Sequence, residues 1–92
     1  MSISIIALLT ADTKVIENIK PVVKDLVEKS RMETGCIRYD AFVGEKGVTF
    51  VEEWTSKEVL NQHEETEHFL ALVHEIEKNK LSIEINFVQP LN

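Results

Sequence analysis

The sequence has few of the residues on which several common classes of protein depend. Its single cysteine, Cys36, excludes an intrachain disulfide. Its three glycines are scattered at positions 35, 44 and 47, so there is no glycine-rich loop to hold the phosphates of a nucleotide or a flavin. No apolar run approaches the roughly 20 residues of a membrane span, and the N-terminal residues lack the basic region of a signal peptide. We therefore expect a protein of the reducing cytoplasm.

Basic residues are also scarce. Ten Lys and Arg stand against 16 Asp and Glu, which gives a net charge of −6 and a pI of about 5.0. Such a surface repels phosphate backbones, and no basic patch or basic helix favours a membrane surface, so we expect neither partner. The 92 residues predict one domain over residues 1–92. Their hydrophobic content of 43% is generous for that size and favours association with a partner.

Alternation and helical spacing predict the first half of the chain. Residues 3–9 have the pattern of a strand that is apolar on both faces. A helix is then expected from Asp12 or Thr13 to about Glu33, kinked by Pro21 and closed by Gly35 as its C-cap.

A hairpin follows, with strands Cys36–Val43 and Val48–Trp54 joined by a turn at residues 44–47. A turn centred on residues 45 and 46 pairs Val43 with Val48, Ala41 with Phe50, Tyr39 with Glu52, Arg38 with Glu53 and Ile37 with Trp54. Because side chains alternate across a strand, one face of this hairpin carries Tyr39, Phe50, Glu52 and Trp54.

The last third predicts two helical segments and a strand. Thr55 with Glu58 forms a capping box for the first segment, and Thr66 caps the second, which ends near Asn79. Residues 81–87 alternate as a final strand. The order β-α-β-β-α-β predicts an α+β, ferredoxin-like fold.

Tyr39 and Glu52 are the first candidates for chemistry. If helices cover their face of the sheet, Glu52 loses water and its pKa rises. The pair would then present polar groups to a substrate in an apolar cleft. The alternative is a Tyr–Glu pair that satisfies its own hydrogen bonds in the core. Trp54 is either a core anchor or a flat wall for an aromatic ligand.

The histidines are the second group of candidates. His63 follows Val59 and Leu60 at helical spacing and is expected on the apolar side, either as a structural residue or as a base for a phenolic proton. His68 lies at a helix start, and His74 falls off the apolar stripe. His63 and His68 are five positions apart, a spacing that matches no common zinc motif, so no metal is expected.

Three motifs in this order resemble the antibiotic biosynthesis monooxygenase family, which includes cofactor-independent quinol monooxygenases. They are residues 33–39 (Glu-Thr-Gly-Cys-Ile-Arg-Tyr), Glu52-x-Trp54, and His63 followed by His68-Phe69. The resemblance covers the whole chain and implies a dimeric α+β barrel with a substrate cleft between sheet and helices in each protomer. The heme-degrading branch of the family uses an Asn on the first strand, and residues 2–10 contain none.

The leading hypothesis is therefore a cofactor-free monooxygenase, active as a homodimer on a quinol or related phenol and O2, without metal, heme or flavin. His63 is the expected catalytic base, and the expected substrate-binding residues are Tyr39, Phe50, Glu52, Trp54 and His68. One alternative is a non-catalytic small-molecule binding module. Another is an isomerase of a small oxygenated signal molecule. Such an enzyme would need basic residues to bind a phosphate, and the expected cleft face has none.

Overall fold

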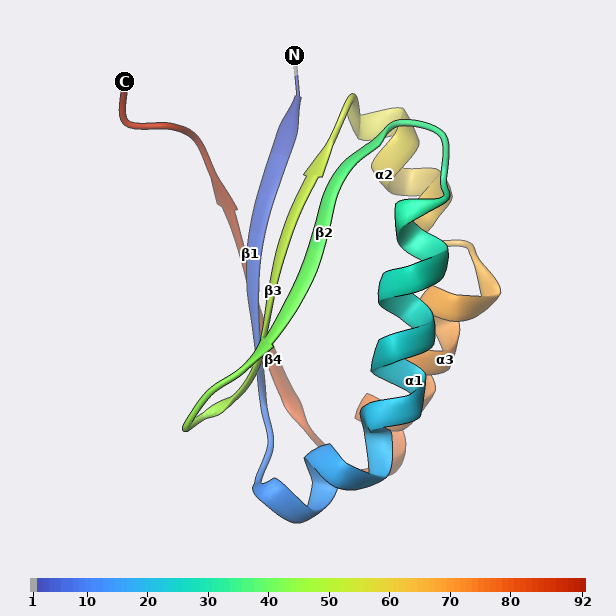
Figure 1. The fold of residues 1–92 in the computed structure, drawn as a ribbon, viewed down its shortest axis with the longest axis vertical. Coiled ribbons are helices and arrows are strands. Elements are labelled where there is room, and N and C mark those ends of the chain that lie inside the picture. The colour runs from blue at the N-terminus through green and yellow to red at the C-terminus, as the bar shows by residue number, and fades with distance from the viewer. Residues whose placement is uncertain (1) are drawn as a thin grey trace.

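The computed structural model describes residues 2–92 as one antiparallel sheet with its helices on one face (Figure 1). The strand order is β2-β3-β1-β4. The elements are β1 (Ile3–Thr10), α1 (Thr13–Arg31), β2 (Cys36–Val43), β3 (Gly47–Trp54), α2 (Lys57–His63), α3 (Glu67–Lys78) and β4 (Ser82–Val88). The predicted ferredoxin-like α+β order is confirmed, with α2 and α3 together in the place of the second helix.

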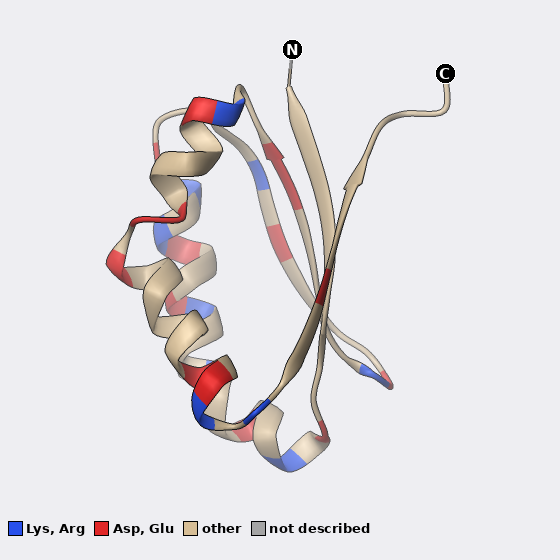
Figure 2. Ribbon diagram, turned by 180° about the vertical axis from the view of Figure 1, so that it is seen from behind, with Lys and Arg blue, Asp and Glu red and all other residues tan. Residues whose placement is uncertain are grey.

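The core lies between the sheet and the helices. Alternate residues of β1 (Ile5, Ala7 and Leu9) are at most 4% exposed, whereas Ile6, on the face without helices, is 41% exposed. From α1, Ile19 and Leu26 are fully buried in the same core. β1, one of the two central strands of the sheet, carries no charged side chain (Figure 2). No helix in residues 2–92 is both long enough and apolar enough to cross a membrane.

Helix α1 begins as predicted but ends earlier. Asp12 is the N-cap, and its side chain accepts a hydrogen bond from the Val15 N–H at 2.9 Å. The helix continues through Pro21 and bends in the blue-to-cyan part of Figure 1. It ends at Arg31 with Met32 as C-cap, so the prediction that Gly35 is the C-cap is wrong. Just after the helix, the Glu33 N–H donates a hydrogen bond to the Ser30 carbonyl, three residues back, as in a 3₁₀ turn.

The hairpin has the predicted register along most of its length. Tyr39 faces Glu52, and Arg38 faces Glu53. The prediction fails at Ile37, because an irregularity between Cys36 and Arg38 places Cys36 opposite Trp54. An extra residue in one strand is left unpaired and bends that strand. Ile37 is accordingly 53% exposed instead of lying on the helix-covered face.

The caps of α2 and α3 fix the segment that carries the histidines. Ser56, rather than the predicted Thr55, is the N-cap of α2 and accepts from the Val59 N–H at 3.2 Å. Thr55 instead donates its N–H to the Gly35 carbonyl at 2.9 Å, which holds it in the loop. Thr66 caps α3 as predicted and accepts from the Phe69 N–H.

Candidate functional site

The largest concentration of candidate residues borders a cavity of about 500 Å³ between the sheet and helices α2 and α3. The side chains of Tyr39, Phe50, Glu52 and His63 contribute to its wall, and the rest of the lining is mainly apolar. This volume falls in the range of small-molecule sites. A second groove of about 360 Å³ follows α1 and β2, and no histidine borders it.

The charges on its border further distinguish the cavity beside helices α2 and α3. The charged side chains on its border are Glu52, Glu64 and Glu77, and neither lysine nor arginine is among its lining residues. An anionic ligand would therefore meet like charge without a counter-ion. The cavity is better suited to a neutral, mainly apolar molecule than to a phosphorylated one.

Tyr39, Glu52 and Trp54 come together on the helix-covered face. The Trp54 indole N–H donates to Glu52 Oε1 at 2.9 Å. The Tyr39 ring, 3% exposed, has its centroid 6.0 Å from that of Trp54. Trp54 is fully buried and does not border the cavity, which differs from the expectation that it forms a wall. It lies behind the cavity and holds the Glu52 carboxyl.

Burial changes the acidity of both polar groups. Loss of water raises the pKa of Glu52 to about 6, although the hydrogen bond from Trp54 opposes the change. Burial and the nearby Glu52 charge both raise the pKa of Tyr39, so its hydroxyl stays protonated at neutral pH. Near pH 6 the cavity therefore holds a carboxyl group that exists in both protonation states.

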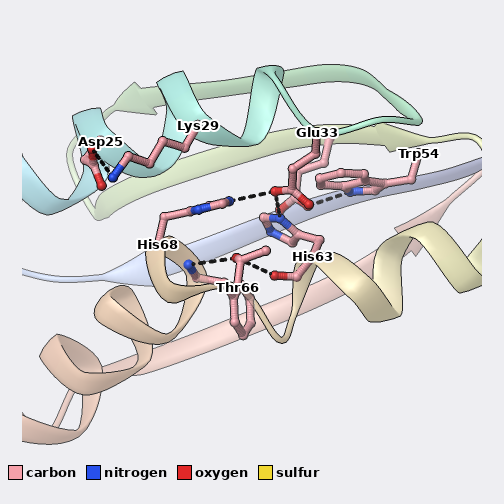
Figure 3. Close-up of polar contacts among 9 residues, drawn as sticks. Asp25, Lys29, Glu33, Trp54, His63, Thr66 and His68 are labelled. Atoms are coloured by element: carbon pink, nitrogen blue, oxygen red, sulfur yellow. Dashed lines mark hydrogen bonds and ion pairs between the residues drawn. The ribbon is translucent and has the colours of Figure 1, made fainter.

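The two histidines meet at a carboxylate that the sequence did not single out. Nδ1 of His63 and Nε2 of His68 each lie 2.7 Å from Oε2 of Glu33 (Figure 3). Glu33 comes from the turn after α1, His63 ends α2, and His68 lies in the first turn of α3. Thr66 joins the two helices, because its hydroxyl donates to the His63 carbonyl at 2.7 Å.

His63 is 1% exposed and fills the space between several aromatic rings. Its ring centroid is 4.4 Å from Trp54, 5.1 Å from Phe69 and 5.5 Å from Tyr39. Burial lowers the pKa of His63, while the hydrogen bond to Glu33 acts in the opposite direction. The net effect keeps the pKa of His63 below its ordinary value, which favours the neutral ring. Within residues 2–92, its Nε2 atom has no hydrogen-bond partner and exposes less than 1 Å².

The same three side chains are a possible donor set for a metal. One atom from each of Glu33, His63 and His68 lies within 4.8 Å of the other two. In a tetrahedral site with bonds of 2.0–2.1 Å, neighbouring ligand atoms are about 3.3 Å apart. Each ring would have to withdraw from Oε2 by about 0.6 Å before an ion could enter on that geometry. As it stands, the cluster has the distances of hydrogen bonds.

The remaining candidates lie outside the cavity. His68 is half-buried beside Glu33 and does not border the cavity. His74 is exposed, as predicted. Cys36 is half-buried, and burial raises the pKa of its thiol, which weakens it as a nucleophile. Glu33 is the residue that sequence reasoning missed as a site residue, although it opens the motif at residues 33–39.

Comparison with known proteins gives this geometry a family context. A model of the antibiotic biosynthesis monooxygenase family matches residues 2–75. A solved structure described as an antibiotic biosynthesis monooxygenase is 30% identical, with a TM-score of 0.83 and full coverage of both chains. Protein PA3566 of Pseudomonas aeruginosa is 28% identical, with a TM-score of 0.84 over 99% of this chain and 95% of that one.

Rv0793 of Mycobacterium tuberculosis shares the fold at 18% identity, with a TM-score of 0.86 over 100% of this chain and 97% of that one. A comparison with curated proteins gave no match. The family model covers well over half of the 92 residues and agrees with the observed fold. The chain therefore belongs to the antibiotic biosynthesis monooxygenase family.

Proposed function

We propose that this protein is a cofactor-independent monooxygenase that oxidises a quinol or related phenol in the cavity between the sheet and helices α2 and α3. The observation that carries the proposal is the cavity itself. Its wall is mainly apolar and lacks basic residues, and it joins a hydroxyl, a carboxyl of raised pKa and a neutral imidazole. Family membership and the name of the 30% identical structure support an oxidative reaction.

The chemistry begins with the phenolic proton. His63 takes it on Nε2, and the phenolate then transfers one electron to O2. The resulting radical pair combines at a ring carbon to form a hydroperoxide, which recovers the proton and loses water. Overall, one quinol and one O2 give a hydroxylated quinone and one water. The apolar wall keeps bulk water from the radical pair.

The other residues hold the substrate. Tyr39 and Glu52 offer a hydrogen-bond donor and a carboxyl group, and Phe50 supplies an aromatic surface beside them. Trp54 acts through Glu52, whose Oε1 it holds at 2.9 Å. His68 does not contact the substrate in this proposal and acts through its hydrogen bond to Glu33. Glu52 is the second candidate for the base, because it borders the cavity and its pKa is about 6.

A homodimer is part of the proposal. The sheet has helices on one face only (Figure 1), and its other face exposes Ile6 at 41% and Phe42 at 52%. Apolar side chains on an open sheet face favour association with another surface. A second copy that packs its sheet against this face would complete the α+β barrel that the sequence resemblance implies. We expect this dimer in the cytoplasm.

A non-catalytic binding module is the second candidate, because Nε2 of His63 is buried. A base at Nε2 would have to come within hydrogen-bond reach of the phenolic proton, whereas a binding module needs no such contact. An isomerase of a phosphorylated molecule is less well supported, since no lysine or arginine borders the cavity.

Aerobic incubation of the chelator-treated protein with a panel of quinols tests the proposal. Oxygen uptake and quinone absorbance are recorded against His63→Ala and Glu52→Gln variants. Multiple turnovers that are lost in His63→Ala support the proposed base, whereas selective loss in Glu52→Gln transfers that role to Glu52. Tight quinol binding with no oxygen uptake by the wild-type protein would instead support the binding module.

A further inference from the structure

A single carboxylate oxygen receives both histidines. Oε2 of Glu33 lies 2.7 Å from Nδ1 of His63 and 2.7 Å from Nε2 of His68 (Figure 3). The Glu33 side chain is 15% exposed and that of His63 is 1% exposed, so the contact between them is shielded from water. Neither lysine nor arginine within residues 2–92 forms an ion pair with Glu33.

This arrangement determines where the proton of His63 lies. An ionised carboxylate only accepts hydrogen bonds, so the nitrogen that faces it must carry a hydrogen. A neutral imidazole has one N–H, and here that N–H is on Nδ1. The lone pair is consequently on Nε2, the nitrogen directed away from Glu33 and without a protein partner.

We propose that Glu33 is a positioning residue that holds His63, a residue that lines the cavity, in the Nδ1–H tautomer and thereby leaves Nε2 as its hydrogen-bond acceptor. The tautomer follows from the contact of Nδ1 with an ionised carboxylate. Its importance for turnover rests on the proposed function, in which Nε2 is the base. A buried acceptor without a partner is unfavourable, and a ligand hydroxyl that donates to Nε2 would remove that cost.

Glu33 also acts on the protonated state. When Nε2 takes a proton, the imidazolium forms beside a carboxylate at 2.7 Å. Such a charge-assisted hydrogen bond stabilises a buried cation that would otherwise be costly. The other charged or titratable groups that act on His63 are His68, which donates to the same oxygen, and Glu64 at the end of α2.

His68 has a supporting part in this arrangement. It approaches Glu33 from α3, whereas His63 approaches from α2, so the carboxylate is held from two elements. Two donors to one oxygen fix its position more firmly than one does. Glu33, the partner of Nδ1 of His63, is therefore held by contacts among three segments: the turn after α1, helix α2 and helix α3.

The tautomer can be measured without a substrate. Long-range 1H–15N correlation spectra of the histidine side chains distinguish a protonated ring nitrogen from a bare one. For the wild-type protein at neutral pH, we expect His63 to show Nδ1 protonated and Nε2 bare, with its signals assigned by their absence from a His63→Gln variant. A proton on Nε2, or on both nitrogens, would overturn the proposal.

Measurement of quinol turnover tests whether Glu33 matters for catalysis. Glu33→Gln keeps an acceptor oxygen but removes the charge, so kcat should fall by at least about tenfold with a smaller change in KM. Glu65→Gln, an equal change of charge at an exposed position between α2 and α3, is the matched control and should behave as wild type. If Glu33→Gln does not fold, Glu33→Asp, which keeps the charge on a shorter side chain, takes its place with the same expected direction.

The outcomes separate the two proposals. Wild-type kcat in folded Glu33→Gln would reduce Glu33 to a structural residue and overturn its positioning role. Failure of the wild-type protein to oxidise any quinol would count against the proposed function, while the spectra would still decide the tautomer. Stoichiometric binding of added Zn²⁺ by the wild-type protein, with the His63 and His68 signals shifted together, would show a metal centre instead and overturn the inference.

Discussion

Replacement of Glu52 by glutamine should make the protein more stable at pH 8 and change its stability little at pH 4. The reason is the partial burial of this carboxyl between the sheet and the helices, which raises its pKa from an ordinary value of 4.5 to about 6. A glutamine has nearly the same shape and keeps an oxygen that accepts the Trp54 N–H, but it never becomes charged. The substitution therefore removes only the cost of a desolvated negative charge.

Proton linkage determines in which direction the stability contributed by Glu52 changes with pH. Between pH 4.5 and 6 the folded protein holds the Glu52 proton more tightly than the unfolded chain does. The contribution of this group to stability is complete below about pH 4.5 and is lost as pH rises through 6. The difference between the two pKa values corresponds to about 2 kcal/mol at most, and solvent reaching the cavity reduces it. Glu52→Gln should recover about 1–2 kcal/mol at pH 8.

Urea unfolding at pH 4 and pH 8, followed by the fluorescence of the single, fully buried Trp54, measures this difference. Protein concentration is held constant, because association would shift the apparent stability. Glu45→Gln in the exposed hairpin turn controls for the loss of one charge. An equal effect of the two substitutions, or a Glu52→Gln protein that is less stable than wild type at pH 8, would refute the reasoning.

Four further expectations follow from the structure and the sequence. Gly35→Ala should destabilise the protein by about 1–3 kcal/mol in urea, because Gly35 has a φ of +91° and an added Cβ would lie 2.7 Å from Thr55 Oγ1; Gly44→Ala, with open space around it, should have little effect. His63→Ala should reduce quinol turnover by about 10²–10⁴-fold and His74→Ala should not, when both are assayed as folded protein. Sedimentation at micromolar concentration should give twice the chain mass of 10.5 kDa; a species of the single chain mass would contradict the dimer. The purified protein should lack stoichiometric metal by elemental analysis and keep its quinol turnover after EDTA; loss of turnover with metal removal would contradict the proposed chemistry.

The local pattern of the sequence determined the fold. Alternation in residues 3–10 and helical spacing after Asp12 define elements through contacts between near neighbours, which a sequence displays directly. The hairpin register was predictable from Val43 to Arg38 because a short turn fixes which residues face each other. Prediction failed at Ile37 and Thr55, where a strand irregularity and a loop hydrogen bond depend on surrounding structure.

Part of the candidate site could also be predicted from the local sequence pattern. Tyr39 and Glu52 lie on one sheet face by register, and His63 lies inward by helical spacing, so the sequence alone brought them to one side of the sheet. It also implied the loss of water that raises the pKa of Glu52. The position of Trp54 behind that carboxyl, rather than on the cavity wall, required side-chain packing from both layers.

Only the tertiary structure brought Glu33 to the histidines. It lies 30 positions before His63 and 35 positions before His68, and no periodicity links positions so far apart. Their contact depends on where α1 ends, how its following turn runs, and how Thr66 sets α3 against α2. A sequence specifies which groups are present, but hydrogen bonds act over about 3 Å. The tautomer of His63 consequently depends on the tertiary structure, which brings Glu33 and His63 into contact.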